Sequence, residues 1–271
     1  MTSSKFNVFI NKKTININDR AFSFGDGVFE TILVKDNQII FLEKHLKRLH
    51  QGCEKLKITK PPMNLLKENC YLCIGNTKNC ILKLVVSRGI SLHGYGFPKS
   101  IKHNIYFFKK RIDKKKYNKT IKLGVANYLP SENVNLSKIK HLNRLDQCLT
   151  SHELLYKKKI QDLVILHRGN IIECISSNIF FVKNHNNMLI FDTPFINDIG
   201  VEGIMRNEII KHLKKNKYKV NIKNIAYKGI DQYMSCFKVN SITGIIFIDR
   251  LEKNKFSLPQ MLYNILNKFL Y

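Results

Sequence analysis

The sequence lacks a long apolar run, and none of its apolar stretches approaches the roughly 18 residues that span a bilayer. The first residues, 1–11, also lack the apolar centre and the small-residue cleavage site of an export signal. We therefore expect a cytoplasmic protein with no membrane partner. With 44% hydrophobic residues among 271, the chain can bury one large core or two smaller ones, which excludes intrinsic disorder.

Acidic residues are scarce: 20 Asp and Glu stand against 46 Lys and Arg, and the formal net charge is +26. Such a charge is typical of nucleic-acid-binding proteins. Eight of the 46 are Arg, however, and Arg is the residue whose planar fork fits phosphates and bases. Because Lys, Asn and Ile share A/T-rich codons, biased base composition accounts for the charge. We predict no nucleic-acid partner.

The cysteines provide no disulfide framework, because seven is an odd number and no export signal accompanies them. The spacing of Cys70, Cys73 and Cys80 suggests a metal, but no second CxxC or His pair completes four zinc ligands. We predict reduced thiols and no metal site.

Helix-like and strand-like segments follow one another without a regular βαβ rhythm, which predicts the α+β class. The charge-rich stretch 109–119 is expected to link an N-terminal domain, 1–115, to a C-terminal domain, 116–271. Residues 19–27 read as a polar turn. The expected helices are 42–56, 62–74, 142–158, 203–216 and 258–271. The expected strands are 5–10, 14–17, 28–34, 38–41, 81–87, 104–109 and 121–126, followed by a meander over 163–166, 171–172, 179–182 and 188–191.

Four segments carry residues that could do chemistry, although each also has an ordinary interpretation. Residues 19–31 could bring backbone close to a ligand, or form a common hairpin loop. Arg48 could bind an anion or be solvated. Lys140, where a loop meets a helix, could be a desolvated amine suited to Schiff-base chemistry, or one Lys among many. Glu173, at the end of an apolar run, could pair with a pyridinium nitrogen or form a salt bridge.

Taken in order, these segments resemble the fold-type-IV pyridoxal-phosphate enzymes, which include D-amino-acid and branched-chain transaminases and the aminodeoxychorismate lyases. The similarity runs from about Val8 to Phe247. It implies two domains, a smaller N-terminal α/β domain and a larger C-terminal domain with a mixed, barrel-like sheet. The motifs are DRAFSFGDGVFET at 19–31, HLKRL at 45–49, IKHLNRLDQ at 139–147, ECISSNIF at 173–180 and GVEGIMR at 200–206.

Within this family, IKHLNRLDQ is most similar to the lyase pattern KHLNRLEQ, with Asp146 where the lyases usually have Glu. Phe29 stands where the transaminases usually have Tyr. The resemblance therefore implies conversion of 4-amino-4-deoxychorismate into 4-aminobenzoate and pyruvate for folate synthesis. The alternative is a transaminase acting on D-amino or branched-chain amino acids. The resemblance also implies a homodimer.

The resemblance implies a role for each matching residue. Lys140 would carry pyridoxal 5'-phosphate and act as the catalytic base, and Thr31 would relay a proton to the leaving group. Glu173 would keep the pyridine nitrogen protonated, and Arg48 would bind the phosphate. Further phosphate contacts would come from the backbone N–H groups of Ile204 and Met205 and from the Thr243 hydroxyl.

One position departs from the family pattern. The lyases often carry an Arg in a Gly-x-Gly-x-Arg-Gly-Tyr stretch, where it is a candidate for binding substrate carboxylate. Here His93 occupies that position. Neutral His binds anions more weakly than Arg does, so Arg88 and Arg144 are further candidates for substrate binding.

Overall fold

The computed structural model describes residues 5–112 and 120–270, and the chain divides into two compact units. Unit 1 comprises Met1–Lys114 and Ile139–Arg144, and unit 2 comprises Lys115–Lys138 and Leu145–Tyr271. Each unit has its own sheet and is described by itself. The expected domain boundary at 115/116 lies outside the described residues.

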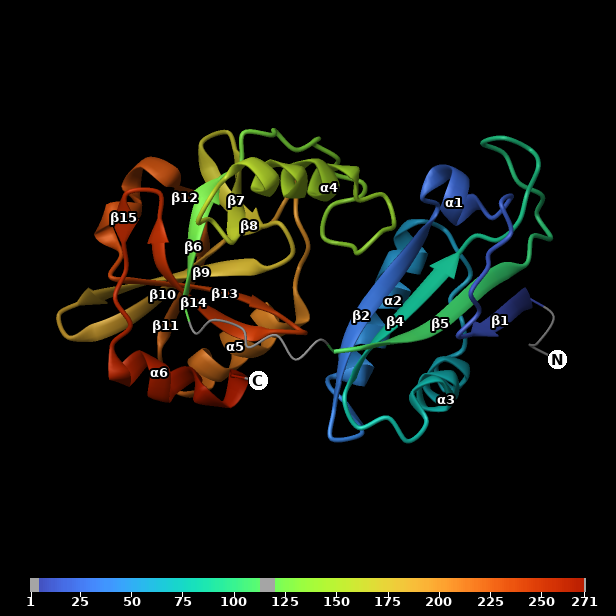
Figure 1. Ribbon diagram of the computed structural model, residues 1–271, viewed down its shortest axis with the longest axis horizontal. Coiled ribbons are helices and arrows are strands. Elements are labelled where there is room, and N and C mark those ends of the chain that lie inside the picture. The colour runs from blue at the N-terminus through green and yellow to red at the C-terminus, as the bar shows by residue number, and fades with distance from the viewer. Residues whose placement is uncertain (1–4, 113–119, 271) are drawn as a thin grey trace. The chain divides into compact units, whose positions relative to one another are not determined.

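Unit 1 is built on a five-stranded sheet with the order β1-β5-β4-β2-β3. β1 pairs with β5 in parallel, and the other neighbours are antiparallel. Helices α2 and α3 lie beside the sheet (Figure 1). The strands are β1 (Phe6–Ile10), β2 (Gly27–Lys35), β3 (Gln38–Ile39), β4 (Cys80–Ser87) and β5 (His103–Arg111), and the helices are α1 (Arg20–Phe24), α2 (Leu42–Lys55) and α3 (Met63–Ile74).

The two faces of this sheet differ in composition, because successive strand residues point to opposite sides. The face packed on α2 and α3, called here the helix face, is apolar except for Glu30 and carries Val28, Ile32, Leu84, Val86, Ile105 and Phe107. The opposite face, called here the aromatic face, carries Phe29, Thr31, Lys83, Val85, Tyr106 and Phe108.

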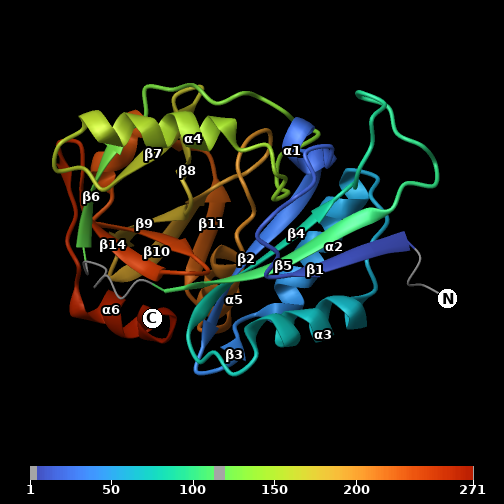
Figure 2. The same ribbon diagram turned by 45° about the vertical axis from the view of Figure 1, so that its right-hand side comes forward.

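Unit 2 is built on a ten-stranded, nearly closed barrel-like sheet with the order β11-β10-β9-β13-β14-β6-β7-β8-β12, and β15 pairs with β14. Figure 2 shows the strands of this sheet from a second direction. The buried core of unit 2 joins residues from these strands. The strands are β6 (Thr120–Val125), β7 (Asp162–His167), β8 (Asn170–Cys174), β9 (Asn178–His185), β10 (Met188–Pro194), β11 (Lys219–Lys223), β12 (Ile225–Ala226), β13 (Ser235–Asn240), β14 (Gly244–Leu251) and β15 (Asn254–Lys255). The helices are α4 (Leu145–His152), α5 (Ile204–Lys215) and α6 (Gln260–Leu266), with 3-10 turns at η2 (Glu153–Tyr156), η3 (Tyr227–Gln232) and η4 (Asn267–Phe269).

The α+β class and the barrel-like second sheet are confirmed, but the expected meander is wrong. β7 pairs with β8 and β9 pairs with β10, as two antiparallel hairpins. Between these hairpins the sheet inserts β13, β14 and β6, which come from distant parts of the sequence. A local pattern identifies each strand but not its neighbour across the sheet.

Four shorter predictions also differ from the structure. Residues 14–17 form no strand, and the turn at 19–27 contains the short helix α1. Lys109–Arg111 belong to β5 rather than to a linker, and 113–119 lie outside the described residues. The helix expected from 142 begins only at Leu145, because the residues before it pair with β2.

A search of the described ranges, 5–112 and 120–270, finds no helix with both the length and the apolar character needed to cross a bilayer.

Candidate active site

The segment that carries Lys140 is attached to the first residues of β2. The N–H of Phe29 donates to the carbonyl of Lys140 at 2.9 Å, and the N–H of Leu142 donates to the carbonyl of Gly27 at 2.9 Å. Val28 and His141 form an antiparallel bridge between these two bonds. Residues 140–142 therefore extend the five-stranded sheet, although 105 or more residues separate them from β2 in the chain.

Two side-chain features fix this attachment. A Cβ on Gly27 would lie 2.4 Å from the carbonyl oxygen of Val86 and 2.8 Å from Leu142, so only glycine permits the close approach. Arg144 donates from Nε to the carbonyl of His141 at 3.0 Å and from Nη2 to the carbonyl of Ile139 at 2.9 Å. These carbonyls flank Lys140, so the guanidinium braces its turn. The predicted contact of Arg144 with substrate stays a prediction.

The Lys140 amine lies over an aromatic ring, with its Nζ 4.3 Å from the ring centroid of Phe29. Thr31 lies two residues further along β2, on the same aromatic face. The structure therefore brings the two predicted catalytic residues to one face of one strand. Phe29 supplies a hydrophobic surface and no hydroxyl beside the amine.

A cavity of about 360 Å³ opens on the same aromatic face, between the sheet and the segment that contains α1. Most of its wall is apolar, which suits the flat face of a small organic molecule. Its walls include Phe9, Phe22, Val85, Tyr106, Phe108 and Leu142.

Arg48, predicted to bind an anion, is held on the helix face by Glu30. Its Nε and Nη2 donate to the two carboxylate oxygens of Glu30, each at 2.7 Å, and Nδ1 of His45 lies 2.7 Å from Oε2. Glu30 and His45 are fully buried, and 11% of the Arg48 side chain is exposed. The bidentate geometry fixes the plane of the guanidinium.

Charge balance in this triad favours ionised Glu30. Burial alone would raise the pKa of the Glu30 carboxyl, but the charges of Arg48 and His45 and their hydrogen bonds outweigh burial and lower the pKa to about 2. The sequence motif contained Glu30, but nothing local showed that it would face α2. The sequence signal for this triad was the spacing of His45 and Arg48, which are three residues apart and so lie on one side of the same helix.

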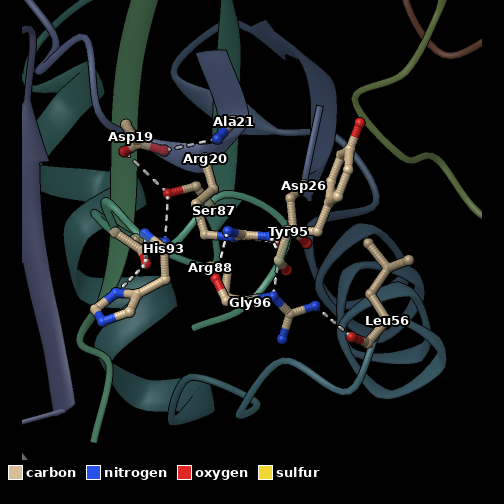
Figure 3. A network of polar contacts seen from close by, with 12 residues as sticks. Asp19, Arg20, Ala21, Asp26, Leu56, Ser87, Arg88, His93, Tyr95 and Gly96 are labelled. Carbon is tan, nitrogen blue, oxygen red and sulfur yellow. Dashed lines mark hydrogen bonds and ion pairs between the residues drawn. The ribbon is translucent and has the colours of Figure 1, made fainter. Parts of the chain in front are cut away.

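Two further arginines share one carboxylate at the start of unit 1. Nε of Arg20 and Nε of Arg88 bind the same oxygen of Asp26, at 2.9 and 2.7 Å (Figure 3). Arg88 also donates to the carbonyls of Leu56 and Lys57, at 2.7 and 3.1 Å. Only 6% of Arg88 is exposed. These contacts give Arg88 a structural role, and its predicted contact with substrate is untested.

Arg20 clamps the loop that contains His93. Its Nη1 donates to the carbonyls of Gly94 and Gly96, at 2.6 and 2.9 Å, and its Nη2 donates to that of Tyr95 at 2.9 Å (Figure 3). The imidazole Nδ1 of His93 lies 3.3 Å from the Ser91 hydroxyl. The loop is therefore held by its backbone. Sequence reasoning missed this role of Arg20, because the loop carbonyls that it binds are 74 to 76 residues away.

In unit 2 the predicted cofactor residues meet at one end of the barrel-like sheet. Glu173, 5% exposed at the end of β8, accepts a hydrogen bond from the N–H of Val201 at 3.0 Å. Gly200 has φ +97°, and a Cβ there would lie 3.3 Å from the Glu173 carboxyl group. The turn before α5 is thus packed directly on this carboxylate.

Helix α5 begins at Ile204, with Gly203 as its N-cap and no side-chain cap. The N–H groups of the first helical turn lack intrahelical acceptors, and within the described residues none accepts from Ile204 or Met205. A Cβ on Gly203 would lie 2.0 Å from Oδ1 of Asn178, so glycine is required where the helix starts. This geometry suits an anion.

Two asparagines tie the neighbouring turns to this helix start. Asn178 donates to the carbonyl of Val201 at 2.9 Å, and Asn240 donates to the Ser177 hydroxyl at 3.1 Å. Oδ1 of Asn240 in turn accepts from the N–H and the hydroxyl of Thr243, at 2.8 and 3.0 Å. The turn that carries Thr243 is therefore joined to the one that follows Glu173.

Comparisons with known proteins cover almost the whole chain. The family model described as amino-transferase class IV matches residues 27–251. The aminodeoxychorismate lyase of Vibrio harveyi is 23% identical over 251 residues, which cover 90% of this chain and 91% of that protein. The D-alanine aminotransferase of Staphylococcus epidermidis is 28% identical over 222 residues, which cover 74% and 73%.

A solved structure shows the same fold. The 4-amino-4-deoxychorismate lyase of Pseudomonas aeruginosa superimposes with a TM-score of 0.85 at 23% identity, over 95% of this chain and 94% of that one.

Proposed function

This chain belongs to the amino-transferase class IV family, and from that premise we propose that it is a pyridoxal-5'-phosphate-dependent lyase. Its substrate in this proposal is 4-amino-4-deoxychorismate, and its products are 4-aminobenzoate and pyruvate. The reaction is an elimination. C4 loses its proton, the bond from C3 to the enolpyruvyl oxygen breaks, and the electron pair left at C4 completes the aromatic ring. The leaving enolpyruvyl oxygen takes up a proton, and the resulting enol tautomerises to pyruvate.

The donor set of the chain fits the cofactor. Lys140 offers an amine, Arg48 offers a guanidinium fixed by Glu30, and Glu173 offers a buried carboxylate. The uncapped start of α5, where Gly203 leaves room beside Asn178, offers N–H groups for a phosphate. These are the groups that an aldehyde, a protonated pyridine and a phosphate dianion require.

When bound, pyridoxal 5'-phosphate withdraws electrons from the carbon that bears the substrate amine. The protein's own part is to hold the reacting groups and move protons. In this proposal Lys140 removes the proton from C4 of the substrate, and the Thr31 hydroxyl passes a proton to the leaving enolpyruvyl group. Arg48, the N–H groups of Ile204 and Met205, and Thr243 hold the phosphate.

The contact between Lys140 and Phe29 favours a lyase over a transaminase. The Lys140 amine lies 4.3 Å from the centroid of a ring that has no hydroxyl. The resemblance described above places a Tyr here in transaminases, which would put a phenol beside the base. An amine that lies over an apolar ring supports proton removal from C4 followed by elimination.

The test couples the purified protein to an enzyme that aminates chorismate, with pyridoxal 5'-phosphate present. We expect 4-aminobenzoate and pyruvate to form in equal amounts, and to depend on both proteins. Absence of both products, with the aminated substrate accumulating, would overturn the proposal.

A transaminase is the second candidate, favoured by the 28% identity to the D-alanine aminotransferase of S. epidermidis. It predicts that D-alanine and 2-oxoglutarate yield D-glutamate at a rate that exceeds 4-aminobenzoate formation. Measuring both products with one preparation separates the two functions.

We further propose that the protein acts as a cytoplasmic homodimer. Leu92 and Tyr95, on the loop that Arg20 clamps, are 80% and 87% exposed, and ordered apolar side chains at a surface are typical of interfaces. Light scattering of the purified protein checks this, and a monomeric mass would contradict it.

A further inference from the structure

Arg206 is a buried cation in the first turn of α5. It is 4% exposed and is the third residue of the helix, after the N-cap Gly203. Its Nε donates to the Thr193 hydroxyl at 3.2 Å, and its Nη2 donates to the carbonyl of Pro194 at 2.9 Å. Both acceptors lie at the end of β10, so the guanidinium ties the start of α5 to that strand.

The same contacts reach the strand that flanks the helix start. The Thr193 hydroxyl donates its own proton to the carbonyl of Ile179 at 2.9 Å, which leaves its oxygen to accept from Arg206. Asn178 precedes Ile179 at the beginning of β9. A Cβ on Gly203 would lie 2.0 Å from Oδ1 of Asn178 and 3.6 Å from Cβ of Arg206. The first residue of the turn is therefore enclosed by Asn178 on one side and Arg206 on the other.

The charge of Arg206 is not balanced by a contacting carboxylate anywhere in residues 5–112 and 120–270. Its two hydrogen-bond acceptors are neutral oxygens. Burial lowers the pKa of Arg206 by more than the charges of Glu202 and Glu173 raise it. A buried charge without a counter-ion in contact is costly, and an additional anion close to it would reduce that cost.

The position of Arg206 in the helix adds to this cost. The N-terminus of a helix carries a partial positive charge, so acidic residues are favoured in the first turn and basic residues in the last. The first turn of α5 has no acidic residue. Within the described ranges the N–H groups of Ile204, Met205 and Arg206 have no acceptor. A buried cation and three free N–H donors therefore concentrate positive charge at one end of this helix.

We propose that Arg206 is a positioning residue for the phosphate of the cofactor, a role that rests on the proposed function, in which pyridoxal 5'-phosphate binds. Its hydrogen bonds hold the first turn of α5 against β10, and its charge adds to that of the helix start. A phosphate dianion bound by the N–H groups of Ile204 and Met205 satisfies these donors and offsets both positive charges. Arg206 acts through the helix, because its guanidinium is engaged with β10.

The experiment measures cofactor binding with and without the phosphate group. Pyridoxal 5'-phosphate and pyridoxal are titrated separately into the cofactor-free protein, and the absorption band at about 410–430 nm gives a dissociation constant for each. Arg206→Met keeps the apolar part of the side chain, and Arg206→Lys keeps the charge. Lys211→Met is the matched control, because Lys211 is a cation of the same helix with 71% of its side chain exposed.

We expect Arg206→Met to weaken the binding of pyridoxal 5'-phosphate about 10- to 100-fold, the effect of removing one buried charge several ångströms from a dianion. The dissociation constant of pyridoxal should stay close to the wild-type value, since pyridoxal has no phosphate. Arg206→Lys should recover most of the lost affinity, and Lys211→Met should behave as wild type. Inorganic phosphate alone should stabilise the wild type against urea more than it stabilises Arg206→Met.

The proposal is overturned if Arg206→Met binds pyridoxal 5'-phosphate as tightly as Lys211→Met does, or if its binding of pyridoxal weakens by the same factor. The second result would show that Arg206 supports the fold alone. Should Arg206→Met not fold, Arg206→Gln replaces it as the uncharged variant.

Failure of this inference and failure of the proposed function give different results. A wild type that binds pyridoxal 5'-phosphate more tightly than pyridoxal but forms no 4-aminobenzoate contradicts the lyase function alone. An active wild type with an unaffected Arg206→Met variant contradicts this inference alone. A wild type that binds neither compound contradicts the proposed function at its first step.

Discussion

The two faces of the five-stranded sheet differ in the contacts that their charged side chains make. On the helix face, Glu30 is fully buried and both of its oxygens are engaged by Arg48 and His45. On the aromatic face, Lys140 and Lys83 lie against Phe29, and Lys83 has no carboxylate partner within the described chain. One face uses charge to fix a side chain, and the other places two lysine amines against an aromatic ring.

This difference arises within three consecutive residues of β2. Phe29 and Thr31 point to the aromatic face, and Glu30 between them points to α2. A buried carboxylate is tolerated only with partners, whereas a cation on an aromatic ring retains its capacity for an anion. The comparison predicts that variants on the aromatic face lose activity, and that removing the buried Glu30 carboxylate lowers the free energy of unfolding.

The largest expected effect is on the aromatic face. Lys140→Ala removes the proposed base and the proposed attachment point of the cofactor, so we expect the lyase rate to fall by more than about 10³-fold. The absorption band at about 410–430 nm, typical of the protonated Schiff base of this cofactor, should disappear.

Lys138→Ala is the matched control for that variant. Lys138 lies two residues earlier, and its Nζ is 6.0 Å from the ring centroid of Phe195. The control should keep both the band and the activity. A Lys140→Ala protein that retains the band would remove Lys140 from its proposed role.

On the helix face, Glu30→Gln should reduce the free energy of unfolding by about 3 kcal/mol, since it leaves Arg48 and His45 without their shared counter-charge. Urea denaturation measures this. Glu43→Gln is the control: Glu43 pairs with Lys67 at the surface, with 57% of its side chain exposed, and should cost less than about 1 kcal/mol. Equal losses in the two variants would contradict the contrast between the two faces.

The stability that Glu30 contributes should also depend on pH. Its pKa is lowered from 4.5 to about 2 in the folded protein, so the unfolded chain binds the proton first as the pH falls. The contribution is therefore complete above the unfolded pKa and is lost between about pH 4.5 and 2. The difference in unfolding free energy between wild type and Glu30→Gln should narrow across that range. A constant difference would show that Glu30 is not ionised in the folded state.

Sequence patterns predicted those parts of the fold and site that depend on neighbouring residues. The turn that leads into α5 and ends at its N-cap Gly203 was predicted from GVEGIMR, and most strands were predicted from short apolar runs. The family and its fold followed from five short motifs in order. Roles such as those of Lys140, Glu173 and Arg48 stay predictions until variants are measured.

The parts that could not be predicted depend on pairing between distant segments. Residues 140–142 read as a loop entering a helix, but they pair with β2 through an isolated antiparallel bridge and the two hydrogen bonds beside it. Arg20 read as a charged residue of a polar turn and Glu30 as a residue of the strand 28–34, but Arg20 binds the loop carbonyls of 94–96 and Glu30 binds side chains of α2. No local spacing indicates which distant backbone a charged side chain will bind.

The smallest expected effect is that of replacing Thr31, which lies next to Glu30 in β2. Thr31→Val keeps the shape of the side chain and removes its hydroxyl, so stability should change by much less than in Glu30→Gln. If the hydroxyl relays a proton to the leaving group, kcat should fall about 10-fold with little change in KM. Thr31→Ser, which keeps the hydroxyl, should recover most of that loss. A Thr31→Val enzyme with the wild-type kcat would leave Lys140 as the only proposed proton-transfer group on the aromatic face, because no other side chain has been assigned that role there.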